Sequence, residues 1–161
     1  MADSALAFGS NLGDSRAMIE AALERLDSAD GISVTKVSSF YRTPPWGVED
    51  QPDFINACAL VETDLSPEAL LAVCKQLEQA LGRETAVRWG PRLIDIDMLW
   101  MEGETRQSET LTLPHPRICE RAFVLVPLAE IAPELDVGDR KVRDLLSALD
   151  PDSLESIRKA D

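Results

Sequence analysis

Two aspartates interrupt an apolar, β-branched segment in the middle of the chain. From Leu93 to Trp100 the residues suit a β-strand, whose side-chain period of two sends Asp95 and Asp97 to one face. At a rise of ~3.4 Å per residue, the two carboxylates stand about 7 Å apart and resist desolvation unless a cation lies between them. Mg²⁺ suits this pair, because it binds carboxylate oxygens and completes its shell with water and phosphate oxygens. The apolar side chains of the strand are expected on the opposite face: Ile94, Ile96, Met98 and Trp100.

Arginines lie immediately upstream of this acidic pair. Arg88 and Arg92 flank a Gly-Pro turn, and guanidinium groups match phosphate oxygens in a bidentate manner. Positive charge followed by paired carboxylates is typical of a nucleotide triphosphate site with bound magnesium. The alternative is an edge strand whose solvated aspartates simply pair with the arginines, and chance matches to a short D-x-D motif are common.

The composition limits the architecture and the kinds of partner. With 161 residues, 45% of them hydrophobic, we expect a single domain over residues 1–161, with a frayed, charged tail from about Asp150. The 16 Lys and Arg against 29 Asp and Glu give a net charge of -13, which argues against a nucleic-acid or anionic-membrane partner. The cysteines show no metal-ligand spacing, and no signal sequence or long apolar run is visible. We therefore expect a cytoplasmic monomer that binds small molecules.

The order of strand and helix patterns predicts the fold class. Strand patterns occupy residues 4–8, 32–41, 54–62 and 93–100. Amphipathic helix patterns occupy 15–27 and 67–81, the second ending at Gly82. Strand, helix, strand, strand, helix, strand is the order of an α+β, ferredoxin-like βαββαβ sheet with helices packed on it. A hairpin pattern at 103–113 and helical patterns at 119–131 and 142–149 predict a C-terminal extension.

Phe54 and Asn56 share one face of the predicted third strand. An aromatic plane beside a carboxamide can stack on a flat heterocycle and hydrogen-bond its edge. The alternative for Asn56 is a structural amide whose hydrogen bonds are all made within the protein.

Three further side chains allow both a functional and a structural interpretation. Trp46, in a proline-rich loop, serves either as a lid or as packing at the edge of the core. His115, the single histidine, lies between two prolines and either contacts phosphate or ribose or is structural. Glu78 lies near a helix C-terminus, where the dipole disfavours a carboxylate unless it binds something, or else it is a solvated acid.

Five sequence motifs occur in order along nearly the whole chain. They are F-G-S-N-L-G-D at 8–14, S-S-F-Y-R-T-P-P-W-G at 38–47, Q-P-D-F-I-N-A at 51–57, R-W-G-P-R-x-x-D-x-D-M-L at 88–99 and L-P-H-P-R at 113–117. Together they resemble the 6-hydroxymethyl-7,8-dihydropterin pyrophosphokinases of folate biosynthesis. The resemblance implies a ferredoxin-like fold, two Mg²⁺ ions and ATP as co-substrate. It also implies transfer of the β,γ-pyrophosphoryl group to the pterin hydroxymethyl oxygen, with release of AMP.

The same resemblance implies roles for individual residues. Asp95 and Asp97 look like the ligands of both metals, and Arg83 and Arg92 look like catalytic cations. The implied pterin site comprises Thr43, Pro44, Trp46, Phe54, Asn56 and Phe123. The implied ATP site comprises Glu78, Arg88, Trp89, Arg92, Met98, Thr112, His115 and Arg121.

Two other functions are compatible with paired aspartates on a ferredoxin-like sheet. A palm-type two-metal nucleotidyltransferase would release pyrophosphate and form a nucleotidyl adduct, whereas the pyrophosphokinase reaction releases AMP. A non-catalytic ligand-binding module would consume no ATP with any pterin. The reaction products therefore discriminate the three functions.

Overall fold

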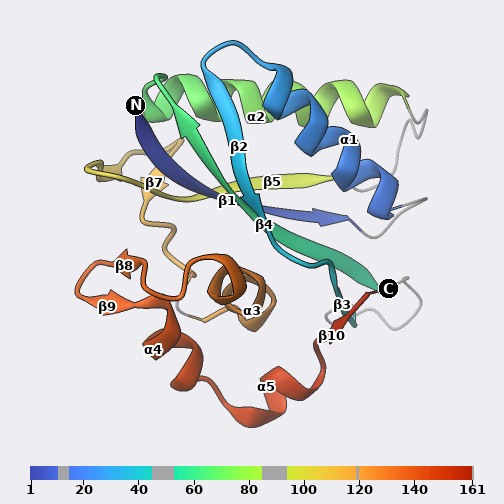
Figure 1. Cartoon of the computed structure of the whole chain (residues 1–161), viewed down its shortest axis with the longest axis vertical. Helices are drawn as coiled ribbons and strands as arrows, with labels where there is room; N and C mark the ends of the chain where they lie inside the picture. Colours follow the sequence, from blue (N-terminus) through green and yellow to red (C-terminus); the bar gives the residue numbers. More distant parts are fainter. Residues whose placement is uncertain (11–14, 45–52, 85–93, 119, 161) are drawn as a thin grey trace.

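A six-stranded antiparallel sheet forms the centre of the protein. The structure, a computed structural model, describes residues 1–10, 15–44, 53–84, 94–118 and 120–160. The sheet consists of β1 (Ala2–Ser10), β2 (Ile32–Val37), β3 (Tyr41–Thr43), β4 (Phe54–Thr63), β5 (Asp95–Met101) and β10 (Arg158–Lys159). Its order is β10-β3-β4-β1-β5, and β2 also pairs with β4 (Figure 1). This is the predicted ferredoxin-like arrangement, in which the first strand lies between the third and the last strand of the βαββαβ unit.

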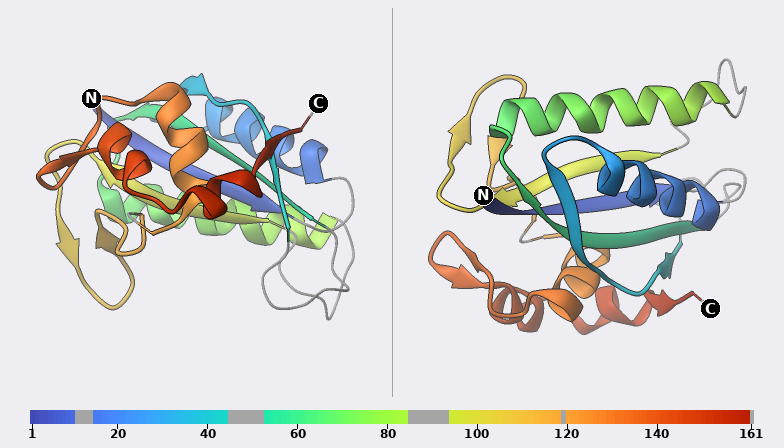
Figure 2. Two further views of the ribbon diagram at one scale, coloured as in Figure 1. Left: turned by 90° about the horizontal axis from the view of Figure 1, so that it is seen from below. Right: turned by 45° about the horizontal axis from the view of Figure 1, so that its top comes forward.

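Two helices cover one face of the sheet. They are α1 (Ser15–Ser28) and α2 (Pro67–Glu84), and both lie on the same side in Figure 2. Ile19 of α1 and Leu70 of α2 join Leu6 and Phe8 of β1 in one buried cluster. The helix stripes predicted from sequence thus pack against the sheet in one of the two core clusters. However, α2 continues past Gly82 to Glu84, so the predicted helix end is early by a few residues.

The C-terminal part of the chain covers the opposite face (Figure 2). Its helices are α3 (Ala122–Ile131), α4 (Val142–Ser147) and α5 (Pro151–Glu155). The hairpin on this face is formed by β8 (Asp136–Val137) with β9 (Arg140–Lys141). A second hairpin, β6 (Arg106–Gln107) with β7 (Thr112–Leu113), instead packs through Leu113 in the cluster under α1 and α2. Leu125 and Leu128 of α3 share a second buried cluster with Ala5 and Ala7 of β1. The two clusters sandwich the sheet.

Two strand predictions differ from the structure. The strand predicted over 32–41 is split into β2 and β3, and between them Ser38 Oγ accepts a hydrogen bond from Cys58 N of β4 at 2.9 Å. In β5 the register against β1 shifts between Ala5 and Leu6, which is a β-bulge that inserts one residue. Trp100 consequently packs with the α3 cluster and not with Ile96, so its predicted face is wrong.

The segment from Asp150, which composition predicts to fray, instead forms α5 and β10. Asp150 caps α5 by accepting a hydrogen bond from Asp152 N at 3.0 Å. β10 pairs with the edge strand β3, and Ala160 N donates to Phe40 O at 2.7 Å. Unpaired backbone groups of an edge strand offer hydrogen bonds to a short segment that could not form a strand alone.

Glu130 ties α3 to the start of β3. Its carboxylate accepts hydrogen bonds from Ser39 N and Ser39 Oγ, each 3.0 Å from Oε2, and from the Tyr41 hydroxyl. Burial by itself would raise the pKa of Glu130, but the hydrogen bonds from Tyr41 and Ser39 outweigh it and hold the pKa below its usual 4.5. The ionised carboxylate is therefore the form that stabilises the fold.

Glu130→Gln should lower the free energy of unfolding at pH 7 by about 1 kcal/mol, because charge-assisted hydrogen bonds become neutral ones. A carboxyl whose pKa is depressed on folding stabilises the protein above the unfolded pKa and loses that effect as pH falls through the folded pKa. The difference in free energy of unfolding between wild type and variant should therefore be constant above about pH 5 and should decrease as the pH falls below about 4.5. Urea unfolding at several pH values measures it. Glu155→Gln, at an exposed position, controls for the substitution, and a gap independent of pH would contradict the prediction.

Candidate active site

One row of paired residues crosses four neighbouring strands. Tyr41 of β3 pairs with Asn56 of β4, Asn56 pairs with Gly9 of β1, and Gly9 pairs with Asp95 of β5. The amide predicted to bind a heterocycle therefore lies two strands from a carboxylate predicted to bind a metal. Gly9 alone separates them in the row.

Asp95 and Asp97 lie on the α3 face of the sheet, as the period of two predicts. Asp97 pairs with Ala7, which belongs to the α3 cluster, whereas the intervening Ile96 is buried in the cluster under α1 and α2. Both aspartates are half-buried. Within the described parts of the chain, no group of three or more His, Cys, Asp or Glu gathers in a metal-binding arrangement. A pair of carboxylates fits Mg²⁺ nonetheless, since this ion usually takes one or two protein carboxylates and fills its shell with water and phosphate.

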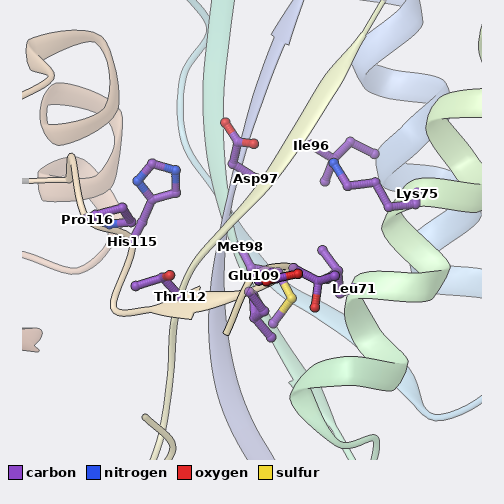
Figure 3. A pocket seen from close by; sticks show the side chains of 11 residues that line it. Leu71, Lys75, Ile96, Asp97, Met98, Glu109, Thr112, His115 and Pro116 are labelled. Carbon is purple, nitrogen blue, oxygen red and sulfur yellow. The ribbon is translucent and has the colours of Figure 1, made fainter. Parts of the chain in front are cut away.

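A pocket opens beside Asp97, between α2, β5 and the segment that follows β6 (Figure 3). Leu71 and Lys75 line it from α2, and Thr112, His115 and Pro116 line it from the opposite side. Four residues predicted to contact a nucleotide or its metal thus border one cavity: Asp97, Met98, Thr112 and His115. Sequence reasoning missed Lys75, although its i,i+3 spacing to Glu78 is typical of a helical ion pair.

His115 is held as a neutral imidazole in the wall of this pocket. Its backbone N donates to Leu99 O at 2.8 Å, and its Nδ1 accepts a hydrogen bond from Arg117 N at 3.2 Å. Burial lowers the pKa of His115, and the charges of Arg121 and Arg117 lower it further, against an opposing effect of Asp97. With Nδ1 as acceptor, the proton of the neutral ring lies on Nε2, which can donate to a phosphate or ribose oxygen.

Glu78 connects α2 to the strand that carries the two aspartates. Its side chain is 8% exposed, its Oε1 lies 3.1 Å from Lys75 Nζ, and its Oε2 accepts a hydrogen bond from Ile96 N at 2.8 Å. Ile96 is the residue between Asp95 and Asp97, and β5 is the last strand of the sheet order. The carboxylate therefore satisfies an outward-facing N–H of an edge strand at the position where the aspartates project.

The polar side chains at the start of β4 are also fixed. Asn56 Nδ2 donates a hydrogen bond to Thr43 Oγ1 at 2.8 Å, and both residues are 7% exposed. Phe54 pairs with Thr43 across β3 and β4 and is half-buried. The structure thus brings together three residues of the predicted pterin site, namely Thr43, Phe54 and Asn56.

Arg121 and Phe123 lie at the N-terminal end of α3, on the same face of the sheet as the aspartates. The guanidinium carbon of Arg121 lies 5.6 Å from the centroid of the Phe123 ring, a distance typical of a cation–π contact. Pro44 follows β3 and is exposed. Arg83 belongs to the last turn of α2, whereas the predicted positions Trp46, Arg88, Trp89 and Arg92 lie outside the described residues.

Comparison with known proteins identifies the family. Residues 5–133 match the family described as 7,8-dihydro-6-hydroxymethylpterin-pyrophosphokinase (HPPK). The chain belongs to this family. The 2-amino-4-hydroxy-6-hydroxymethyldihydropteridine pyrophosphokinase of Methylorubrum extorquens is 52% identical over 152 residues, which cover 94% of this chain and 96% of that protein. The Bacillus subtilis protein of the same name is 45% identical over 131 residues, covering 81% and 78% of the two chains.

Solved HPPK structures share the fold. The wild-type HPPK-DHPS protein of Plasmodium falciparum with pteroate superposes with a TM-score of 0.73 over 91% of this chain, at 15% sequence identity. The chain spans 44% of that longer protein. At this identity the likeness supports the ferredoxin-like HPPK architecture alone. Within the part of the chain that the structure describes, no helix is long and apolar enough to cross a membrane.

Glu78→Ala should lower the free energy of unfolding by about 1–3 kcal/mol, because the Ile96 N–H loses its carboxylate acceptor. Glu78→Gln retains an acceptor oxygen and should lose less. Urea denaturation measures the stability, and hydrogen exchange at the Ile96 amide reports the local bond directly. Glu24→Ala, at an exposed position of α1, is the matched control. Unchanged exchange at Ile96 in Glu78→Ala would contradict the assignment.

Proposed function

We propose that the protein transfers pyrophosphate from ATP to the hydroxymethyl group of 6-hydroxymethyl-7,8-dihydropterin, forming AMP and the pterin diphosphate for folate biosynthesis. Membership of the HPPK family supports this reaction. The structural observation that carries the proposal is the row in which Asn56 and Asp95 flank Gly9. It supports the proposal because a side chain that would bind a heterocycle and a side chain that would bind metal lie near each other on one face of one sheet.

We assign the pocket beside β5 to ATP. Leu71, Met98 and Leu111 give it an apolar lining for the adenine ring, and Thr112 and the neutral His115 offer hydrogen bonds to ribose or phosphate. Asp97 borders the same pocket, so a triphosphate that extends from it reaches the two aspartates. We assign the triphosphate contacts to Arg121 and to the arginines at positions 83, 88 and 92, with Trp89 and Glu78 completing the ATP site.

The pterin occupies the face beside Asn56 in this proposal. Phe54 and Phe123 stack on the two sides of the ring, and Thr43 and Asn56 bind its polar edge. Pro44 and Trp46 complete the site. Such a ring would direct its hydroxymethyl arm along the row toward Asp95.

Asp95 and Asp97 would hold two Mg²⁺ ions, which would neutralise and orient the phosphate oxygens during transfer. Pyrophosphoryl transfer asks the protein mainly for in-line positioning and charge stabilisation. In this proposal the residues of this chain would provide both, since the sheet fixes the distance between Asn56 and Asp95 and the arginines would supply positive charge. We also expect the protein to act as a cytoplasmic monomer. Its net charge of -13 argues against a nucleic-acid partner.

Incubation of the protein with ATP, Mg²⁺ and reduced hydroxymethylpterin should produce AMP, and Asp97→Ala should reduce that rate by at least about a thousandfold. The magnitude follows from the several kcal/mol of charge stabilisation that a bound metal supplies. Chromatographic detection of AMP measures the rate, and thermal unfolding verifies the fold of the variant. Asp139→Ala, in the exposed turn between β8 and β9, should retain full activity. Turnover at the wild-type rate by Asp97→Ala would refute the metal assignment, and release of free pyrophosphate would indicate a nucleotidyltransferase.

Phe54→Ala should raise the KM for the pterin by roughly tenfold, because stacking of a heterocycle on an aromatic ring contributes about 1–3 kcal/mol. Phe54→Tyr keeps the ring plane and should bind the pterin as the wild type does. Steady-state kinetics with each substrate varied in turn measures both KM values. The KM for ATP serves as the internal control, and an equal rise in both KM values would argue against stacking by Phe54.

A further inference from the structure

Gly9 occupies the central position of the proposed site without having been assigned a role. It pairs with Asn56 on one side and with Asp95 on the other, near the C-terminal end of β1, the strand that lies between β4 and β5 (Figure 1). Its neighbours on the same face of β1, Ala5 and Ala7, are packed in the α3 cluster. Gly9 is thus the small residue at the end of this face.

A side chain at Gly9 would collide with the proposed pterin-binding amide. A Cβ atom built on Gly9 would lie 2.9 Å from Asn56 Oδ1, and among the described residues that oxygen is the one heavy atom within 4 Å. A carbon and an oxygen that are not bonded do not approach so closely in real proteins. The space over Gly9 therefore admits either the Asn56 oxygen in its observed place or a Cβ, but not both.

Asn56 cannot easily move aside. Its Nδ2 donates to Thr43 Oγ1 at 2.8 Å, and both side chains are 7% exposed in the interior of the protein. Rotation of the amide away from Gly9 would break this bond and leave buried polar groups without partners, which is unfavourable. The bond to Thr43 also fixes which end of the amide faces Gly9, namely the acceptor Oδ1.

We propose that Gly9 is a positioning residue for the heterocyclic substrate, whose missing side chain keeps Asn56 Oδ1 directed at an N–H donor on the edge of the ring. The inference rests on the proposed function, because it assumes that this face binds a pterin. Asn56 and Asp95 lie two strand spacings apart, or about 10 Å at ~4.8 Å per strand. A two-ring heterocycle with a hydroxymethyl arm can bridge that separation when nothing projects from Gly9.

The test compares Gly9→Ala with wild type in steady-state kinetics and in titration with a non-hydrolysable ATP analogue. The KM for the pterin should rise by about tenfold or more, which is the loss expected for one misplaced hydrogen bond. The dissociation constant of the nucleotide analogue should not change, because Gly9 does not line the pocket beside α2. Gly82→Ala is the matched control, since a Cβ at Gly82 meets no described atom within 4 Å.

The Asn56→Ala background separates this mechanism from general damage to the sheet. Without Oδ1 the added methyl group has no collision partner, so Gly9→Ala should cause little further rise in the pterin KM there. If Gly9→Ala alone does not fold, the double variant should regain the fold, and failure of both to fold would overturn the proposal. Equal rises in pterin KM in the two backgrounds would also overturn it. Absence of AMP formation by the wild-type protein would instead refute the proposed function, whatever Gly9 does.

Discussion

The pairing of β1 with β4 on one side and β5 on the other is the constraint on which the site depends. Because the register is fixed, Asn56, Gly9 and Asp95 lie in one row. The two faces of β1 differ in size: Leu6 and Phe8 fill the core under α1 and α2, whereas Ala5 and Ala7 lie under α3. Because the residues on one face of the strand are small, α3 packs closely against that face. The end of the face is where we propose that the pterin binds.

Most of the fold could be predicted from side-chain periodicity, because the βαββαβ core consists of regular elements whose buried faces repeat. The exceptions arise where long-range contacts decide. Ser38 receives a hydrogen bond from Cys58 in the adjacent strand, at the break between β2 and β3. The bulge in β5 moves Trp100 to the other face, and an inserted residue leaves no local sign in an apolar segment. The strand β10 exists because β3 offers an edge, which composition does not reveal.

For the site, sequence reasoning succeeded where residue type and spacing on one strand were enough. The shared face of Asp95 and Asp97 follows from the side-chain period of one strand. The proximity of Asn56 to Thr43, which lie on two different strands, came from the family resemblance. For Glu78, the unfavourable position of a carboxylate near a helix end left two alternatives open, a binding partner or a solvated acid, and the structure shows a partner. That partner includes the backbone of Ile96, which sequence reasoning could not identify because it requires knowing how α2 lies against β5.

The position of β5 at the edge of the sheet explains why the pocket forms where it does. An edge strand has outward N–H and C=O groups that need partners. Glu78 of α2 accepts from Ile96 N, and His115 N donates to Leu99 O. These two hydrogen bonds bring the helix and the segment after β7 against the same strand edge, and the pocket lies between them. The contacts that complete the sheet therefore also build the walls of the proposed nucleotide site, so a change that weakens the edge should affect the fold and ATP binding together.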